Sequence, residues 1–115
     1  MKFTRLLIIS GLTALFFNLS IFAQQNGSLS GQVVDSLGAI VVGASVSVVS
    51  PAGTEKTTTS NGRGEFSVTG LAPGKYTVRI SAAKFALYEN TEVDIAAGTK
   101  AELIATLTVA GVQEQ

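Results

Sequence analysis

The 115-residue sequence contains no cysteine, no histidine and no tryptophan. Without cysteine the chain has no disulfide and no thiol nucleophile, and without histidine as well it lacks the usual ligands of a zinc site. A nucleophilic serine would have no histidine to activate it. Eight basic residues balance eight acidic ones, and a chain without a basic excess is a poor candidate for binding nucleic acid. We therefore expect no metal, no cofactor and no nucleic-acid partner.

The first 23 residues differ in kind from the rest of the chain. They contain 15 hydrophobic residues and two basic ones, Lys2 and Arg5, but no acidic residue. A basic start, an apolar stretch and a small residue, Ala23, before a polar segment are typical of a secretory signal peptide. We predict cleavage after Ala23. The alternative is an uncleaved membrane anchor, because residues 6–23 fall just short of the roughly 20 apolar residues that span a bilayer.

A cleaved leader predicts an exported protein, located in the periplasm, at the outer membrane or outside the cell. Export without cysteine suits a bacterial envelope protein that does not depend on disulfides. After the leader we expect a linker over residues 24–27, one domain over residues 28–109 and a tail over residues 110–115. These residues carry six basic and eight acidic side chains, a formal net charge of −2, and no second membrane span is expected.

Short stretches rich in valine, threonine and serine alternate with turn signals after the leader. Glycine and proline recur at the turns, where they supply the backbone angles that tight turns need. In several of these stretches apolar and polar residues alternate with a period of two, as in strands with one buried and one solvated face. The pattern predicts seven strands, near residues 28–35, 44–50, 54–60, 65–69, 75–82, 87–95 and 100–109. The segment 81–87 is the weakest of these assignments and allows a helical turn.

Seven strands at this spacing indicate two antiparallel sheets packed as a β-sandwich. The core is expected to be mostly aliphatic, because only four aromatic residues follow the leader. We place Phe66, Tyr76 and Phe85 inside the sandwich and Tyr88 half-buried at the start of a strand.

Three stretches carry a resemblance to a known family. The opening reads LSGQVVD over residues 29–35, followed by Gly38 and by VGASVSV over residues 42–48. The middle reads GEF over residues 64–66 and LAPGKYTV over residues 71–78. With a closing strand that ends at Leu107, these motifs resemble the carboxypeptidase regulatory-like domain family over nearly all of residues 28–109. Their order and spacing carry the resemblance, since no single short match is specific.

The resemblance implies a seven-stranded antiparallel Greek-key sandwich of the Ig-like or prealbumin-like kind, similar to transthyretin, to Cna-B modules and to starch-binding-domain-like folds. Such a motif identifies a scaffold rather than a reaction. The residues that match it, with structural roles, are Gly31, Asp35, Gly38, Gly43, Ala44, Gly64, Phe66, Pro73, Gly74 and Tyr76. Lys84 departs from the family, which usually has glycine there, and lysine resists a positive φ.

Physical roles follow for several of these residues. Gly31 allows another group to approach its strand closely. Asp35 can cap the turn that follows it, and Gly43 permits a bend before the next strand. Pro73 and Gly74 fit a type II turn.

No constellation of residues predicts a catalytic site. Glu89, Glu92 and Asp94 could do acid–base chemistry, but their alternation favours a solvated strand face. Asp35 with Ser36 supplies too few oxygens for a calcium site. Residues 62–64 resemble a phosphate-binding loop only superficially, because no helix follows them.

Interaction surfaces are the better candidates for function. Tyr88 is the one aromatic residue that could stack on a sugar ring. Residues 57–60 form a polar edge strand to which another strand could be added. Val34, Val49 and Ile104 fall on outer faces and would mark an interface if they cluster.

The sequence therefore predicts an exported, non-catalytic β-sandwich that acts as a structural or protein-interaction module of the bacterial envelope. The family also occurs at the N-terminal side of TonB-dependent outer-membrane receptors, which suggests an envelope protein or a downstream domain as the partner. A free-standing protein and a truncated receptor are both compatible with the sequence. The alternative function is a carbohydrate-binding module, with Tyr88 as the ligand contact.

Overall fold

The computed structural model describes residues 25–111, so the predicted signal peptide and residues 112–115 of the predicted tail lie outside it. Seven strands form in the described part, and no helix there is long and apolar enough to cross a membrane. All seven predicted strands are present, and each end falls within two residues of its predicted position. The strands are β1 (Gly27–Asp35), β2 (Ser45–Val49), β3 (Glu55–Thr59), β4 (Glu65–Leu71), β5 (Gly74–Ser81), β6 (Tyr88–Ile95) and β7 (Lys100–Leu107). The first begins inside the predicted linker.

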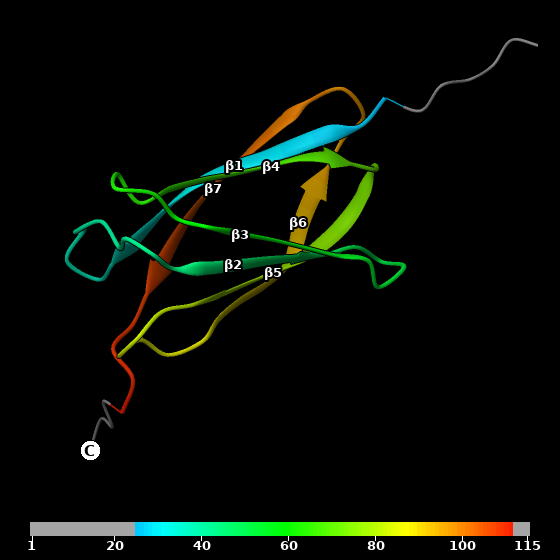
Figure 1. Cartoon of the computed structure of the whole chain (residues 1–115). Helices are drawn as coiled ribbons and strands as arrows, with labels where there is room; N and C mark the ends of the chain where they lie inside the picture. The colour runs from blue at the N-terminus through cyan, green and yellow to red at the C-terminus, as the bar shows by residue number, and fades with distance from the viewer. Residues whose placement is uncertain (1–24, 112–115) are drawn as a thin grey trace, which may run out of the picture.

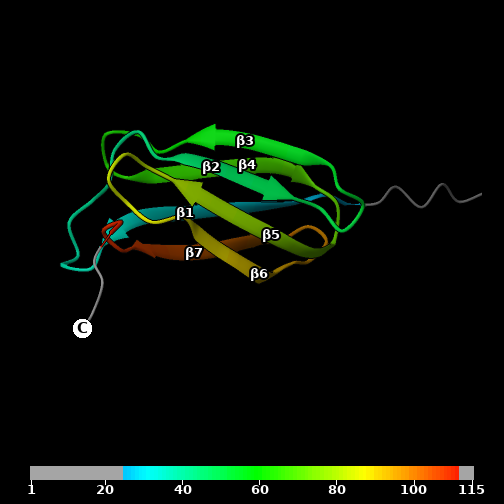
Figure 2. The same cartoon turned by 90° about the horizontal axis from the view of Figure 1, so that it is seen from below.

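The strands form two sheets that pack face to face (Figure 1). One sheet has the order β4-β1-β7, and the other has the order β3-β2-β5-β6, which Figure 2 shows strand by strand. Four of the five strand pairs are antiparallel, as predicted, but β1 and β7 run parallel. The prediction of two wholly antiparallel sheets was therefore wrong for this pair. Side-chain alternation reports which face of a strand is buried and carries no information on strand direction.

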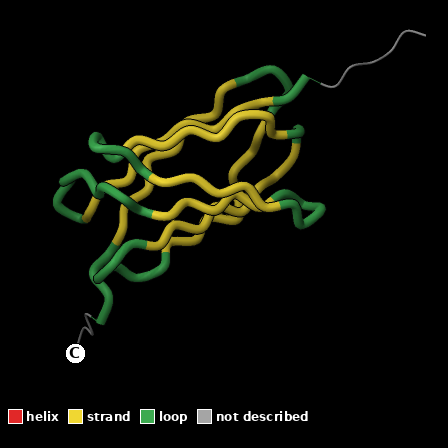
Figure 3. The backbone as a smooth tube through the Cα atoms, in the orientation of Figure 1, coloured by secondary structure: helices red, strands yellow, loops and turns green. Residues whose placement is uncertain are grey.

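The chain enters the sandwich at one end and leaves it at the other. In the parallel pair, Ser28 lies opposite Lys100 at one end, and Asp35 lies opposite Leu107 at the other. The connecting loops collect at these two ends, with the strands between them (Figure 3). We call them the entry end, with residues 50–54, 72–73 and 96–99, and the exit end, with residues 36–44, 60–64 and 82–87.

The core is built by the inward-facing residues of both sheets. Its largest fully buried side chains are Leu29, Leu71, Ile80, Leu107, Val33, Val46, Val48 and Val78. Phe66 and Tyr76 are buried, as predicted, and Tyr88 is partly buried. Phe85 is only partly buried, which corrects its predicted place in the core. It lies in the loop before β6, in a single bridge to Val109 at the exit end. The amide of Phe85 donates to the carbonyl of Ala82 at 3.1 Å, and the positive φ of Lys84 between them makes this a β-turn rather than a helical turn.

Ser60 is buried as well, although it was predicted on the polar edge. Its hydroxyl donates to the carbonyl of Val41 and accepts from the amide of Ala44, both at 2.8 Å. These two bonds tie the segment before β2 to the end of β3. A buried hydroxyl with both bonds made is stable inside a protein, and the position of a residue in an alternating pattern does not reveal such a pair.

Candidate interaction surfaces

Gly31 lies at the centre of β1, directly opposite Phe66 of β4. A β-carbon on residue 31 would overlap both the aromatic ring of Phe66 and the carbonyl oxygen of Leu103. Glycine is therefore required for close packing in the three-stranded sheet. Gly64 also has no room for a β-carbon, which would lie 2.8 Å from the carbonyl oxygen of Val33. It has a φ of 71°, and its own carbonyl accepts from the amide of Val33 at 2.7 Å.

Asp35 caps the turn that follows β1. Its carboxylate oxygen Oδ1 accepts from the amides of Leu37 at 2.8 Å and Ala39 at 3.0 Å. Gly38 has a φ of 83° within this turn, and Gly43 has a φ of 75° in the bend before Ala44, which is fully buried. The carboxylate of Asp35 thus holds a turn with two backbone bonds.

Pro73 and Gly74 do not form the predicted type II turn. That turn needs a φ near 80° at glycine, whereas Gly74 has a φ of 155° and is already the first residue of β5. The corner is held instead by Tyr76, whose hydroxyl donates to the carbonyl of Ala72 at 2.8 Å. A side chain, rather than turn chemistry, fixes the chain here.

Lys84 has a φ of 72° and is the one residue other than glycine with a positive φ among residues 25–111. Its carbonyl accepts from the amide of Ala110 at 2.9 Å. The position therefore keeps the left-handed conformation that suits glycine in the family, with lysine in place of glycine.

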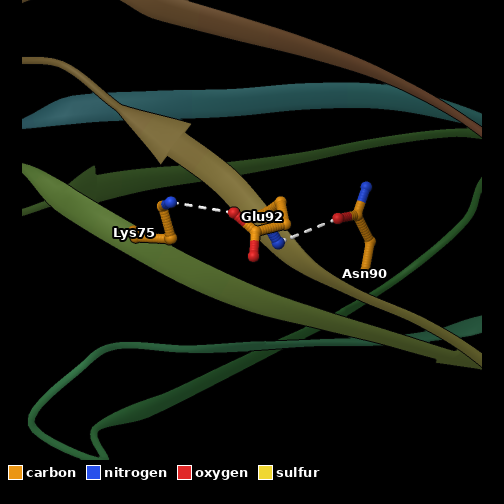
Figure 4. Close-up of polar contacts among 3 residues, drawn as sticks. All are labelled: Lys75, Asn90 and Glu92. Atoms are coloured by element: carbon orange, nitrogen blue, oxygen red, sulfur yellow. Dashed lines mark hydrogen bonds and ion pairs between the residues drawn. The ribbon is translucent and has the colours of Figure 1, made fainter.

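Glu89, Glu92 and Asp94 lie on the exposed outer face of the four-stranded sheet. Glu92 pairs with Lys75 and Glu89 with Arg79, each at 2.8 Å (Figure 4 shows the first pair). The pKa of Lys75 lies above its ordinary value because Glu92 accepts its hydrogen bond and, with Asp94, supplies negative charge nearby. These acids form cross-strand ion pairs in solvent, and the described residues contain no acidic cluster that could hold a metal ion.

The larger hollow of the surface lies on the outer face of the three-stranded sheet, with a volume of about 720 Å³. Small and polar side chains of β1 and β4 form much of its lining, including Ser30, Gln32 and Ser67. Lys100 and Glu102 of β7 add charges. A smaller cavity of about 380 Å³ lies at the entry end and is lined by Pro51, Leu71, Pro73 and Tyr76, among others.

Most of the exposed large apolar side chains lie at the exit end. Six such residues are exposed in the described part of the chain: Leu37 (92%), Ile104 (71%), Leu87 (63%), Val42 (59%), Val109 (53%) and Ile40 (47%). Five of them belong to the exit-end loops or to the segment just after β7, and Ile104 is the exception. We call Leu37, Ile40, Val42, Leu87 and Val109 the apolar end.

Val34, Val49 and Ile104, which would mark an interface if they clustered, do not form one cluster. Val34 and Ile104 are diagonal neighbours on the three-stranded sheet, where Gln32 lies opposite Ile104 and Val34 opposite Thr106. Val49 lies on β2, in the other sheet. The apolar end was missed because most of its residues lie in loops, outside any alternating pattern, while Val109 fell at the end of the predicted strand 100–109. The available signal was the presence of Leu37 and Ile40 beside a glycine turn, where polar residues are usual.

Tyr88 packs against the core from the start of β6, and its hydroxyl accepts a long bond of 3.4 Å from the Asn90 side chain. Part of its ring is thus covered by protein. Thr57 and Thr59 lie on β3, which is an edge strand, as predicted.

Comparisons with solved structures found the same fold in proteins of diverse kinds. A putative carbohydrate-binding protein from Bacteroides uniformis is 18% identical, with a TM-score of 0.60 over 72% of this chain and 41% of that one. The minor pilin of Streptococcus agalactiae is 11% identical, with a TM-score of 0.61 over 80% and 48%. Hydroxyquinol 1,2-dioxygenase from Pseudomonas putida is 11% identical, with a TM-score of 0.63 over 79% and 59%. At these identities the likeness is one of fold alone.

The chain matches less than two-thirds of the length of each of these proteins. A search of curated proteins found no match. The sequence profile of one family, however, matches residues 28–108, which is more than half of the chain and coincides with the sandwich. The protein therefore belongs to the carboxypeptidase regulatory-like domain family.

Proposed function

We propose that the protein is an exported, non-catalytic module of the bacterial envelope that binds another protein through its apolar end. The observation that carries this proposal is the uneven placement of exposed apolar side chains. Leu37, Leu87 and their three neighbours of the apolar end are exposed by 47% or more. Apolar side chains grouped on one part of a surface are a mark of protein–protein contact.

The entry end is a natural comparison within the same molecule. Its loops are also mostly exposed, but none of the six exposed large apolar residues lies there. Its exposed apolar residues are small, such as Ala52 and Ala97. A general excess of apolar residues in loops therefore does not account for the apolar end. The partner is either a separate envelope protein or a further domain of the same polypeptide.

The non-catalytic part of the proposal is supported by the chemistry of the polar groups. The chain has no histidine or cysteine, and Glu89 and Glu92 are each engaged in exposed ion pairs. Export is supported by the leader-like sequence of residues 1–23. Mass spectrometry of the protein recovered from the envelope of an expressing bacterium tests export, and the expected N-terminus is Gln24. A protein that retains Met1 and stays in the cytoplasm would contradict export.

Site-specific photo-crosslinking tests the binding surface. A photoreactive amino acid replaces Leu37 or Leu87 at the apolar end, and in matched controls it replaces Ala52 or Ala97 at the entry end. In living cells we expect the first two positions to form crosslinks to one discrete protein band, and the controls to form none. Equal crosslinking from the two ends would refute the apolar end as the binding surface.

A carbohydrate-binding function is the second candidate. The observation that favours it is the hollow of the three-stranded sheet, because Ser30, Gln32 and Lys100 can hydrogen-bond sugar hydroxyls. Titration with soluble polysaccharides tests it. Gln32→Ala tests binding in the hollow, and Tyr88→Ala tests stacking of a sugar on the tyrosine ring. Saturable binding that is lost in one of these variants would establish it, and binding to none of the polysaccharides would argue against it.

A further inference from the structure

The two sheets have four edge strands, β4 and β7 in one and β3 and β6 in the other. An edge strand presents unpaired backbone amides and carbonyls, which can pair with a strand of another molecule unless something prevents it. Proteins commonly protect their edges with charged side chains, bulges or irregular backbone. The four edges of this sandwich differ sharply in such protection.

Lys56 protects the side on which β3 and β4 lie. Its ammonium group leaves β3 and donates to the carbonyls of Thr69 at 3.0 Å and Gly70 at 2.9 Å, both in β4. Two carbonyls near the end of β4 are thus already bonded. Gly70 also has a φ of 69°, and the register between β1 and β4 shifts nearby, between Gly27 and Leu29. The edge strand β3 itself has only five residues.

The edge of β6 is protected by a bulge. The register between β5 and β6 shifts between Tyr76 and Val78, which leaves Thr91 and Glu92 opposite a single residue. The side-chain oxygen of Asn90 accepts from the amide of Glu92 at 3.0 Å (Figure 4). A backbone donor of this strand is therefore satisfied within the strand itself.

The edge of β7 has no bulge and no irregular backbone, and its two charged side chains, Lys100 and Glu102, lie within the first three residues of the strand. All eight of its residues pair with β1 in one unbroken register, and the strand contains neither glycine nor proline. Within residues 25–111, no backbone hydrogen bond joins β7 to any segment other than β1. The first protected position follows the strand, where the carbonyl of Thr108 accepts from the amide of Ala86 at 2.8 Å. The outward side chain of Ile104 is 71% exposed on this edge.

We propose that β7 pairs in antiparallel fashion with β7 of a second copy of the chain, with the two Ile104 residues directly opposite each other. The result is a continuous six-stranded sheet in the order β4-β1-β7-β7-β1-β4 around a two-fold axis. A two-fold interface uses the same patch on both copies, so the patch must be complementary to itself.

The register centred on Ile104 meets this requirement. It pairs two exposed β-branched side chains at the axis, and such cross-strand pairs stabilise a sheet. It also places Glu102 opposite Thr106, so no like charges face each other. A register centred on Glu102 would instead set two carboxylates opposite each other, which destabilises a sheet. The Ile104 register spans residues 101–107 and stops before Thr108, where Ala86 occupies the edge.

Pairing of two copies through β7 does not use the apolar end. Because the paired strands are antiparallel, the two apolar ends point in opposite directions and remain free for the partner proposed above. The failure of either proposal would leave the other intact, since Ile104 does not belong to the apolar end.

Cysteine crosslinking of the full chain in the envelope of expressing cells tests the proposal, and the absence of native cysteine makes the readout clean. Residues directly opposite in an antiparallel pair have Cα atoms about 4.5–5.5 Å apart, within the range that a disulfide spans. We expect Ile104→Cys to give a disulfide-linked dimer under mild oxidation. Val49→Cys, on the outer face of the other sheet, is the control and should remain monomeric.

A mixing experiment tests the register itself. In the Ile104 register two copies of residue 102 are about 13 Å apart, so Glu102→Cys alone should not crosslink. Co-expression of differently tagged Glu102→Cys and Thr106→Cys variants should give a mixed disulfide dimer. The proposal is overturned if Ile104→Cys dimerises no more than Val49→Cys, if it crosslinks only to a different protein, or if Glu102→Cys crosslinks to itself as readily as to Thr106→Cys.

Discussion

Gly31 of β1 and Phe66 of β4 lie so close together that no β-carbon fits on residue 31. The ring of Phe66 covers the backbone of the central strand, and the carbonyl of Leu103 closes the space from the other neighbouring strand. This contact joins all three strands of the smaller sheet.

Gly31→Ala should therefore lower the free energy of unfolding by about 2–3 kcal/mol, since an overpacked core must shift backbone or ring. Urea unfolding followed by circular dichroism measures the change. Gly62→Ala is the matched control, because a β-carbon there meets no atom within 4 Å. Similar stability of the two variants would show that the smaller sheet absorbs the extra methyl group without strain.

Lys84→Gly should raise the free energy of unfolding by about 0.5–1 kcal/mol. A left-handed conformation costs a residue with a β-carbon about 1–2 kcal/mol, and the greater freedom of glycine in the unfolded chain offsets part of the gain. Thermal and urea unfolding measure it. Lys84→Ala keeps the β-carbon and removes the charge, so it should leave stability unchanged. If Lys84→Ala stabilised the protein as much as Lys84→Gly, charge rather than backbone conformation would be responsible.

Ser60→Ala should destabilise the protein by about 1–3 kcal/mol, because it leaves the buried carbonyl of Val41 and the amide of Ala44 without their side-chain partner. Hydrogen exchange at the amide of Ala44 should also become faster. The control is Ser45→Ala, which removes an exposed hydroxyl one residue after Ala44. Unchanged exchange at Ala44 would mean that the hydroxyl of Ser60 does not hold this amide.

The contribution of Lys75 to stability should disappear at high pH. Its pKa is raised above the ordinary value of 10.5 by the hydrogen bond and charge of Glu92, with a smaller effect of Asp94. A raised pKa in the folded state gives a contribution that is complete below the unfolded pKa and is lost as pH rises through the folded pKa. The stability difference between the wild type and Lys75→Met should thus be constant below about pH 9.5 and shrink above about pH 10.5.

Urea titrations across this pH range, at low and high salt, measure the difference. The side chains are exposed, so the effect should be small and weakened by salt. In a Glu92→Gln background, Lys75→Met should make less difference to stability at each pH where Lys75 is charged. A pH dependence that is unchanged in that background would assign it to another group.

Alternation located the strands that have one face on the core and one in solvent, whereas β3, which has no buried residue, was located by its threonines and the turn signals on either side. It could not show that β7 runs parallel to β1, since side-chain alternation is the same in both directions. It also misplaced Ser60, whose burial depends on two backbone groups brought to it by the fold. Phe85 was placed inside by its hydrophobicity, yet it lies at the rim of the sandwich, where covering is incomplete.

The interaction surfaces were harder to predict than the strands. Edge position alone pointed to residues 57–60, but the protection of that side depends on the reach of Lys56 across to β4, which no local pattern encodes. The apolar end unites turns from distant parts of the sequence, such as those of Leu37 and Leu87. Sequence reasoning could judge each of these residues only singly, and a single exposed apolar residue carries no meaning.

The parallel pairing of the first and last strands determines how the domain responds to force. Tension applied through the two ends of the chain pulls β1 toward the entry end and β7 toward the exit end, along the direction of the strands. The hydrogen bonds between them, in an unbroken register from Ser28–Lys100 to Asp35–Leu107, are then loaded together in shear rather than opened one after another. We expect such a domain to resist stretching between its two ends more strongly than one whose terminal strands open one hydrogen bond at a time.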